Sequence, residues 1–116
     1  MVKQIRALPD EVIGLEQIIL LLPTGQNLFV VDIHDTALFD QIESETDAHV
    51  VFLETSFAAG CFIASCSKVP RSGGEIIATA QSRSELEKRL EKDPFKKLQL
   101  AKHTLTEFLP SMMTEG

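Results

Sequence analysis

Two short apolar segments joined by a glycine-containing loop constrain the fold of this chain more than any other feature. The segments are CFIASCS at 61–67 and EIIATAQ at 75–81, and the loop between them is KVPRSGG at 68–74. Apolar and β-branched side chains favour strands, and a short loop with proline and glycine lets the chain reverse its direction. The pattern therefore predicts an antiparallel hairpin in the middle of the chain.

A predicted helix and a further strand flank the hairpin on each side. The strand NLFVVDIH at 27–34 precedes a helix at 37–59, and a helix at 82–93 precedes a last strand at 103–110. The order βαββαβ is that of the ferredoxin-like fold, an α+β fold with its helices on one face of an antiparallel sheet. We therefore expect one domain at 27–111, which forms a homodimer through the open face of its sheet.

Some parts of the chain allow more than one interpretation. Residues 1–26 form an N-terminal extension that fits a short helix, an extra strand or a partly ordered arm equally well. Residues 112–116 form a C-terminal tail. Ser82 and Ser84 are both suitable N-caps for the helix at 82–93.

Charge and composition argue against several kinds of partner. The 116 residues have a net charge of −6, and the 11 basic residues are scattered along the chain. Nucleic acids and anionic membranes are bound by clustered lysine and arginine side chains, so we expect neither as a partner. The longest apolar run, IILLL at 18–22, is far shorter than the ~20 residues of a membrane span, and no signal peptide pattern is present. These features indicate a cytoplasmic protein.

The two cysteines fit a reducing compartment. Cys61 and Cys66 lie in one predicted strand, so their side chains point to opposite faces and stand ~16 Å apart. A disulfide requires Cα atoms within about 7 Å of each other. Reduced thiols in a cytosolic protein are the simple interpretation.

One histidine falls on the predicted buried face of the helix at 37–59. At 100° per residue, His49 is near the centre of an apolar stripe that also carries Glu45 and Ser56. The apolar members of the stripe are Leu38, Ile42, Phe52, Leu53 and Phe57. Two interpretations stay open at this point. His49 is either a core residue satisfied by a carbonyl group or by Glu45, or an imidazole in a pocket that acts as a base or a ligand.

Four segments in a fixed order resemble the YCII-related family of small bacterial proteins. They are AHVVFLETSFAAGCFIAS at 48–65, KVPRSGG at 68–74, SRSELEKRLEKDPF at 82–95 and EFLPS at 107–111. The resemblance extends over most of the chain, from about Leu28 to Ser111. It implies a ferredoxin-like domain that dimerises through its sheet, as in the dimeric α/β-barrel superfamily.

The resemblance also implies a site. Family members place a histidine of the first helix near an aspartate of the DPF turn, a proposed active-site pair, and the matching residues here are His49 and Asp93. A carboxylate that faces an imidazole fixes its tautomer and makes the free nitrogen a better base. A few relatives act on small aromatic or chlorinated ring compounds.

The chain departs from the family pattern after the second predicted strand. The family's Ser-Gly-Pro is replaced by Ser65-Cys66-Ser67, which alters the backbone beside the expected pocket and adds a thiol. Ser65 and Cys66 are candidate substrate-binding residues. Cys66 is also either a nucleophile for His49 to activate or a simple packing residue. Arg71 in the hairpin loop is either a clamp for a carboxylate or phosphate or a solvated arginine.

The remaining polar residues carry weaker predictions. Asp32 and His34 share one side of the first strand, but no recurring metal-ligand spacing accompanies them, so we expect them to keep an edge strand soluble. His103 is expected at the surface, at the start of the last strand. The chain has no glycine-rich phosphate loop and no haem motif, so we predict neither a cofactor nor a metal.

Three functions are compatible with these observations. The first is a small enzyme of lyase or hydrolase type, in which His49 is a general base oriented by Asp93 and the substrate is a small organic acid or ring compound. The second is a non-catalytic module that binds a small metabolite or another protein. The third is a dimer in which His49 belongs only to the core.

Overall fold

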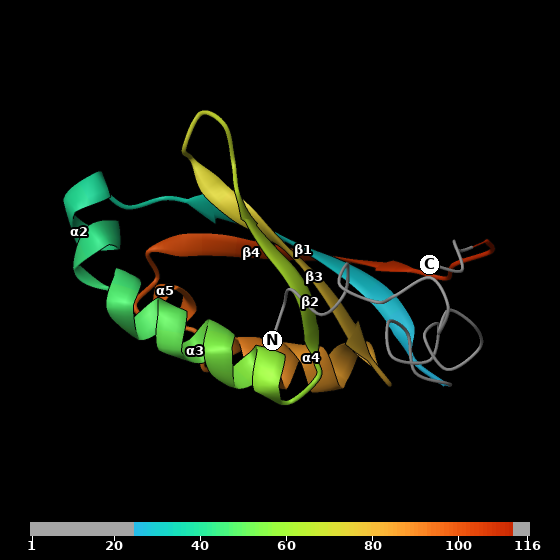
Figure 1. Cartoon of the computed structure of the whole chain (residues 1–116). Helices are drawn as coiled ribbons and strands as arrows, with labels where there is room; N and C mark the ends of the chain where they lie inside the picture. Colours follow the sequence, from blue (N-terminus) through green and yellow to red (C-terminus); the bar gives the residue numbers. More distant parts are fainter. Residues whose placement is uncertain (1–24, 113–116) are drawn as a thin grey trace, which may run out of the picture.

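The computed structural model describes residues 25–112 of the chain. The predicted extension at 1–26 and the predicted tail at 112–116 lie almost entirely outside the described residues. The elements of the described part, shown in Figure 1, are in chain order β1 (Asn27–Asp35), α2 (Phe39–Ser44), α3 (Thr46–Ala58), β2 (Phe62–Ser67), β3 (Gly73–Ala80), α4 (Arg83–Leu90), α5 (Pro94–Lys97) and β4 (Ala101–Phe108).

The four strands form one antiparallel sheet with the order β2-β3-β1-β4. α3 and α4 lie side by side across one face of this sheet, and α5 lies beside the first part of α3, near the start of β4 (Figure 1). Element order, strand order and helix placement together confirm the predicted α+β, ferredoxin-like fold. β1 occupies a central position in this sheet, so the expectation that it is an edge strand was wrong.

The predicted hairpin is formed by β2 and β3, although its two glycines belong to the strand and not to the loop. Gly73 has a φ of +147°, and a Cβ atom there would lie 1.9 Å from the Ile33 carbonyl oxygen of β1. A Cβ atom on Gly74 would lie 2.6 Å from the Cys66 carbonyl oxygen. The two glycines are therefore required because three strands approach each other closely at this point.

The helix predicted at 37–59 is broken into α2 and α3. The break falls at Glu45, whose φ of −108° and ψ of 5° are not helical. The helix also starts later than predicted, because the N–H groups of Thr36 and Ala37 both donate to the carbonyl oxygen of Leu100. These two hydrogen bonds keep the chain extended up to Leu38. Leu38 is 76% exposed, so its prediction as a member of the buried stripe was wrong.

α4 and α5 are two short helices separated by a capped turn. Ser82 caps α4, since its Oγ accepts a hydrogen bond of 3.1 Å from the Glu85 N–H. α4 ends at Leu90, and the carboxylate of Asp93 then caps α5 by accepting a hydrogen bond of 3.0 Å from the Phe95 N–H. The first residue of a helix needs no N–H group, because that group would have no partner in the helix, so proline is favourable there. Pro94 is accordingly the first residue of α5.

The core lies between the helices and one face of the sheet. Alternate side chains of β1 and β3 point into it, and they meet side chains from all four helices. The principal buried members are Phe29, Val31, Ile33, Ile76, Ala78, Ile42, Phe52, Leu86, Leu90 and Phe95. Burial of each large apolar side chain stabilises the fold by about 1.5–3 kcal/mol, so this layer is the main source of stability. It also fixes the positions of α3 and α5, which carry the polar side chains described next.

Candidate active site

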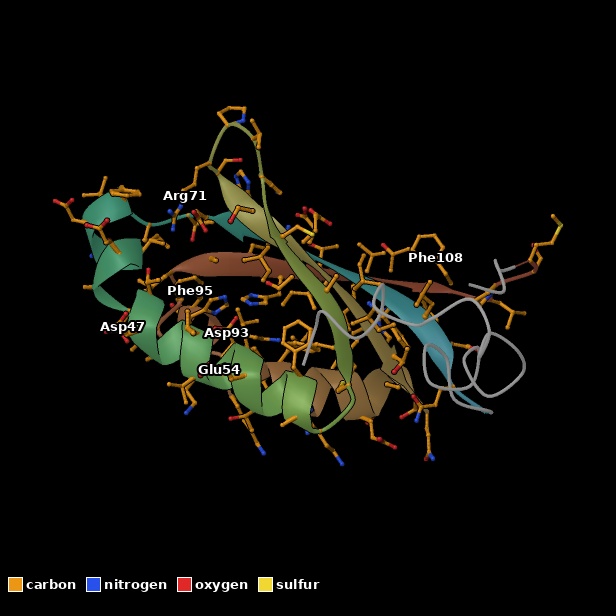
Figure 2. All side chains as sticks on the ribbon, viewed as in Figure 1. Asp47, Glu54, Arg71, Asp93, Phe95 and Phe108 are labelled. Atoms are coloured by element: carbon orange, nitrogen blue, oxygen red, sulfur yellow. The ribbon has the colours of Figure 1, made fainter. Side chains whose placement is uncertain are left out.

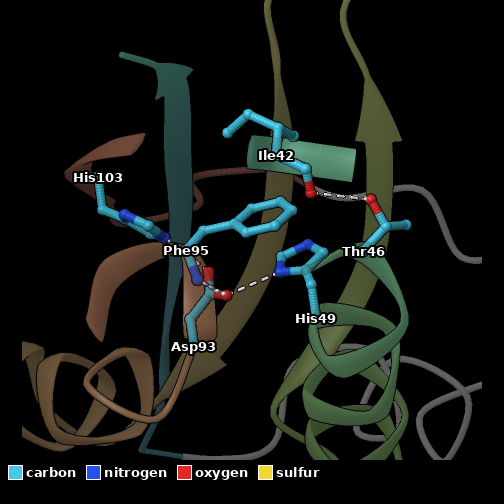
Figure 3. Close-up of polar contacts among 6 residues, drawn as sticks. All are labelled: Ile42, Thr46, His49, Asp93, Phe95 and His103. Carbon is cyan, nitrogen blue, oxygen red and sulfur yellow. Dashed lines mark hydrogen bonds and ion pairs between the residues drawn. The ribbon is translucent and has the colours of Figure 1, made fainter. Parts of the chain in front are cut away.

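Three polar side chains meet in a chain of hydrogen bonds at one end of the core (Figure 3). His49 is in the first turn of α3, Asp93 caps α5, and His103 is in β4. The His49 Nδ1 is 2.7 Å from the Asp93 Oδ1, and the His103 Nε2 is 2.7 Å from the Asp93 Oδ2. The structure therefore brings His49 and Asp93 into direct contact, and it adds a second histidine to the pair.

The carboxyl group of Asp93 is fully buried and ionised. Burial by itself raises the pKa of a carboxyl group, but the hydrogen bonds with His103 and His49, the charge of His49 and the Phe95 N–H together outweigh it and lower the pKa of Asp93 to about 2. At neutral pH the group is a carboxylate with all its surrounding donors in place. A buried charge that is satisfied in this way is a fixed electrostatic feature of the site.

His49 combines a fixed orientation with access to a cavity. Its ring is stacked on the ring of Phe95, with centroids 4.1 Å apart and an angle of 6° between the planes. The side chain is 13% exposed, and its Nε2 forms no hydrogen bond within residues 25–112. Figure 3 shows this second nitrogen on the part of the ring that points away from Asp93. The ring can therefore exchange a proton with a bound molecule without leaving Asp93.

The cavity beside His49 has a volume of about 190 Å³. Its lining includes His49 from α3 and all three predicted binding residues. Ser65 and Cys66 come from β2, and Arg71 comes from the hairpin loop. Its other principal lining residues are Ile33, Asp35, Ile42, Thr46, Val50, Leu53, Ser67, Glu75, Ile76 and Phe95. The lining is thus a mixture of apolar side chains and a few polar ones, as in sites that bind small molecules.

Ser65 and Cys66 border the cavity from different faces of the sheet. Ser65 is paired with Ile76, whose side chain points into the core, whereas Cys66 is paired with Glu75. Because side chains alternate along a strand, the thiol of Cys66 points to the face away from the helices. The alternative in which His49 activates this thiol therefore lacks the geometry it needs.

Arg71 lies at the border of the cavity between the hairpin loop and α2 (Figure 2). Its guanidinium carbon is 5.6 Å from the centre of the Phe39 ring, which is a cation–π distance. No carboxylate within the described chain forms an ion pair with Arg71 at 4.0 Å or less. The guanidinium can therefore receive an anionic group of a bound molecule.

The prediction for His103 was wrong, because its side chain is fully buried. β4 begins at Ala101 and not at residue 103, so His103 is inside the strand and is paired with Ile33 of the central strand β1. Ala101, His103 and Leu105 share the face that packs on the helices. The alternation of these three residues with Lys102, Thr104 and Thr106 is the sequence signal that identifies the buried face.

Asp32 and His34 lie on the opposite face of the sheet from the cavity residues of β1. The carboxylate of Asp32 is 2.9 Å from the Lys68 Nζ. The contacts with Glu75, and then with Lys68, lower the pKa of Asp32, and the contact with Asp32 raises the pKa of Glu75. Of the two carboxyl groups, Asp32 is therefore the stronger acid, and Lys68 lies beside its charge. Between residues 25 and 112, no group of three or more His, Cys, Asp and Glu side chains is arranged to hold a metal ion.

A second, larger cavity of about 330 Å³ lies where the end of α3 faces α4. Its lining includes Gly60, Cys61, Lys88, Arg89 and Lys92, and none of the predicted site residues. Arg89 donates a hydrogen bond of 3.3 Å to the Oγ of Ser56, which explains how that buried member of the predicted stripe is satisfied. Size alone would favour this cavity. The buried ionised group and the oriented imidazole make the smaller one the candidate active site.

Comparisons with protein-family models and with curated proteins find no match. A comparison with solved structures finds 5-chloro-2-hydroxyhydroquinone dehydrochlorinase (TftG) from Burkholderia phenoliruptrix AC1100, in complex with 2,5-dihydroxybenzoquinone. The two proteins are 22% identical, with a TM-score of 0.61, over 71% of this chain and 93% of that chain. This likeness supports the fold assignment. In the described part of the chain, no helix has the length and apolar character needed to cross a membrane.

Proposed function

We propose that this chain is a YCII-like enzyme in which His49, oriented by Asp93, is the general base for an elimination or a hydrolysis on a small organic molecule. One observation carries the proposal. The imidazole of His49 has one nitrogen bound to a buried carboxylate and its other nitrogen free beside a cavity. This is the arrangement that general base catalysis requires.

The proposed chemistry follows from the two states of the imidazole. In the resting protein His49 donates its Nδ1–H to the carboxylate of Asp93, and the lone pair of Nε2 is available. In an elimination, Nε2 takes a proton from the substrate, the electrons of that bond form a new double bond, and the leaving group departs with its own bonding pair. In a hydrolysis, Nε2 takes a proton from the attacking water as the water oxygen bonds to the substrate, and the imidazolium returns that proton to the leaving group when its bond to the substrate breaks. In both reactions Asp93 stabilises the imidazolium that forms.

The dimensions and lining of the cavity favour a substrate with one ring or a molecule of similar size. A protein cavity of about 150 Å³ accepts benzene, so about 190 Å³ accommodates a six-membered ring with small substituents. Ile33, Ile42 and Leu53 supply apolar contacts, and the ring of Phe95 supplies an aromatic edge. In this proposal Arg71 binds an acidic oxygen of the substrate, and Ser65 donates a hydrogen bond to it.

The structural neighbour supports the same class of substrate. It is a dehydrochlorinase, which is a lyase, and its ligand 2,5-dihydroxybenzoquinone is a single ring with polar substituents. The family resemblance of the sequence and the shared fold support a homodimer through the face of the sheet that carries Val30, Ile77 and Thr106. We infer that the working molecule is this dimer, in the cytoplasm.

A combined binding and turnover screen tests the proposal. Hydroxylated benzoquinones, chlorinated hydroquinones and small carboxylic acids are offered to the wild type and to His49→Gln, Asp93→Asn and His34→Gln. Thermal shift reports binding, and chromatography reports turnover. We expect ring compounds with an acidic oxygen to stabilise the wild type and to be converted. Asp93→Asn is expected to lower kcat by about 10²–10⁴-fold, because the wrong tautomer then faces the substrate.

His34→Gln is the histidine control, since His34 lies on the face of the sheet away from the cavity, and light scattering checks that this variant keeps the wild-type mass. It should retain full turnover. Ligands that stabilise the wild type and His49→Gln equally, without conversion by either, would instead identify a non-catalytic binding module. The proposal of a small-molecule site fails if no compound raises the melting temperature of the wild type and if Arg71→Ala gives the same thermal shifts as the wild type.

A further inference from the structure

His103 is an unusual residue for the position that it occupies. Its side chain is fully buried beneath the helices, on a strand position that faces the core. An apolar side chain would fill this space without the cost of burying a polar ring. The histidine uses one nitrogen, Nε2, to contact the free oxygen of Asp93 at 2.7 Å. The other nitrogen, Nδ1, is buried and has no hydrogen-bond partner among the described residues.

The carboxylate determines which nitrogens carry protons. An ionised carboxylate only accepts hydrogen bonds, so each ring nitrogen at 2.7 Å from Asp93 must carry a hydrogen. His49 therefore has its hydrogen on Nδ1, and His103 has its hydrogen on Nε2. The Phe95 N–H occupies Oδ1 together with His49, so Oδ2 depends on His103.

The unpartnered nitrogen of His103 then determines the charge of its ring. A hydrogen on Nδ1 would make the ring a cation with a buried, unsatisfied N–H group, which costs far more than an unsatisfied lone pair. His103 is consequently a neutral donor. It satisfies Asp93 without neutralising it, and the whole negative charge of the carboxylate stays available to His49.

We propose that His103 is a positioning residue of the active site, which orients Asp93 and thereby directs the lone pair of His49 Nε2 into the cavity. This inference rests on the proposed function only where it assigns the lone pair to general base catalysis. The geometry that it describes needs no substrate. The three side chains act in sequence: His103 holds Oδ2, Asp93 holds the Nδ1–H of His49, and His49 presents Nε2.

Nitrogen-15 NMR of the full-length protein tests this inference without a ligand. The protein is labelled at its histidine nitrogens, and long-range proton–nitrogen correlation spectra give the tautomer of each ring at a pH where the rings are neutral. The spectrum of His34→Gln assigns the third histidine. In the wild type we expect His49 as the Nδ1–H tautomer and His103 as the Nε2–H tautomer.

Two variants of similar length separate positioning from space filling. His103→Met has no donor, whereas the amide of His103→Gln can donate to Asp93 from about the place of the imidazole Nε2. We expect His103→Met to lower the ratio of Nδ1–H to Nε2–H tautomers of His49 by about tenfold, the value of one charge-assisted hydrogen bond of ~1.4 kcal/mol. His103→Gln should stay within about twofold of the wild type. Asp93→Asn is the positive control for loss of the preference.

Several results would overturn the proposal. They are an Nδ1–H tautomer or a cationic ring at His103 in the wild type, an Nε2–H tautomer at His49, and a folded His103→Met with the wild-type ratio. If His103→Met does not fold, His103→Gln decides, because loss of the preference in that variant contradicts the role of the donor. A failed ligand screen leaves these spectra unaffected, so the two proposals fail separately.

Discussion

Asp93 combines full burial with a negative charge, which a folded protein tolerates only when donors surround the group. Three donors do so here, from the side chains of His49 and His103 and from the backbone of Phe95. Each of these donors belongs to a different part of the site. The carboxylate therefore stabilises the fold and orients the imidazole by means of the same hydrogen bonds.

The low pKa of Asp93 predicts a loss of stability in acid. The pKa is about 2 in the folded chain against an ordinary value of 3.8, so the unfolded chain takes up the proton first as the pH falls. The resulting contribution to the free energy of unfolding is about 2 kcal/mol. It is fully present above about pH 4 and is lost as the pH falls to about 2. Urea unfolding of the wild type between pH 6 and pH 2 measures this loss.

The variant Asp93→Asn should lack this part of the pH dependence and be less stable at pH 6. Glu54→Gln is the matched control, because Glu54 is an exposed carboxyl group on α3. Its pH dependence should match that of the wild type. An acid transition that is identical in wild type and Asp93→Asn would show that other carboxyl groups cause it.

At the scale of the elements, short capped helices hold the site. α5 has only four residues, and Asp93 is its N-cap. The carboxylate of Asp93 therefore stabilises the same short helix that holds it in position. α4 carries no site residue, but its end leads directly into the turn before Asp93. Three residues separate α4 from α5, and Asp93 is the last of them. The stability of α4 therefore affects the position of the Asp93 carboxylate.

The two serines at the start of α4 give a matched test of this element. Ser82 caps the helix through its Oγ, whereas Ser84 lies inside the helix and is exposed. We expect Ser82→Ala to lower the free energy of unfolding by about 1 kcal/mol, because one N–H at the helix start loses its partner. Ser84→Ala should change it by less than ~0.5 kcal/mol. Equal effects in urea unfolding would assign the cap to neither residue.

Element boundaries show what the sequence pattern could not supply. The apolar periodicity and the turn residues were sufficient to predict the strands, the hairpin and both helical regions. The late start of α2 depends on hydrogen bonds from Thr36 and Ala37 to Leu100, more than sixty residues away in the chain. The glycine pair fits a loop when read locally, but the neighbouring strand β1 makes it part of the sheet.

At the scale of the whole molecule, the helices between residues 25 and 112 all lie on one face of the sheet, and none of them covers the other face. That second face carries Val30, Ile77 and Thr106 in neighbouring strands, together with the charged group around Asp32. Face-to-face packing of two such sheets would bury the apolar side chains of both copies. The proposed dimer follows from this surface and from the family resemblance.

A single charge on this face tests the dimer. We expect Thr106→Lys to convert a dimer into a folded monomer, because a buried cation without a partner costs several kcal/mol, or more than ~100-fold in the dissociation constant. Light scattering after size-exclusion chromatography measures the mass, and circular dichroism checks the fold. Val51→Lys, on the exposed surface of α3, should remain a dimer. A dimeric Thr106→Lys would place the interface elsewhere.

The site shows the same division between sequence and structure. His49 was identified from its place in an apolar stripe, and Asp93 only from the resemblance of its DPF turn to a family motif. His103 was missed, because the start of a strand near a chain turn is ambiguous without its partner strand. The burial of His103 depends on pairing with Ile33 and on the packing of α5.

The sequence by itself determined the fold class, the hairpin and the place of His49 on an apolar stripe, because these depend on interactions between residues close in the chain. Only the tertiary structure decided that His49, Asp93 and His103 form one hydrogen-bonded chain and that Cys66 points away from it. Those facts depend on strand register and on helix packing. Register and packing join residues that are distant in sequence, and no local pattern specifies them.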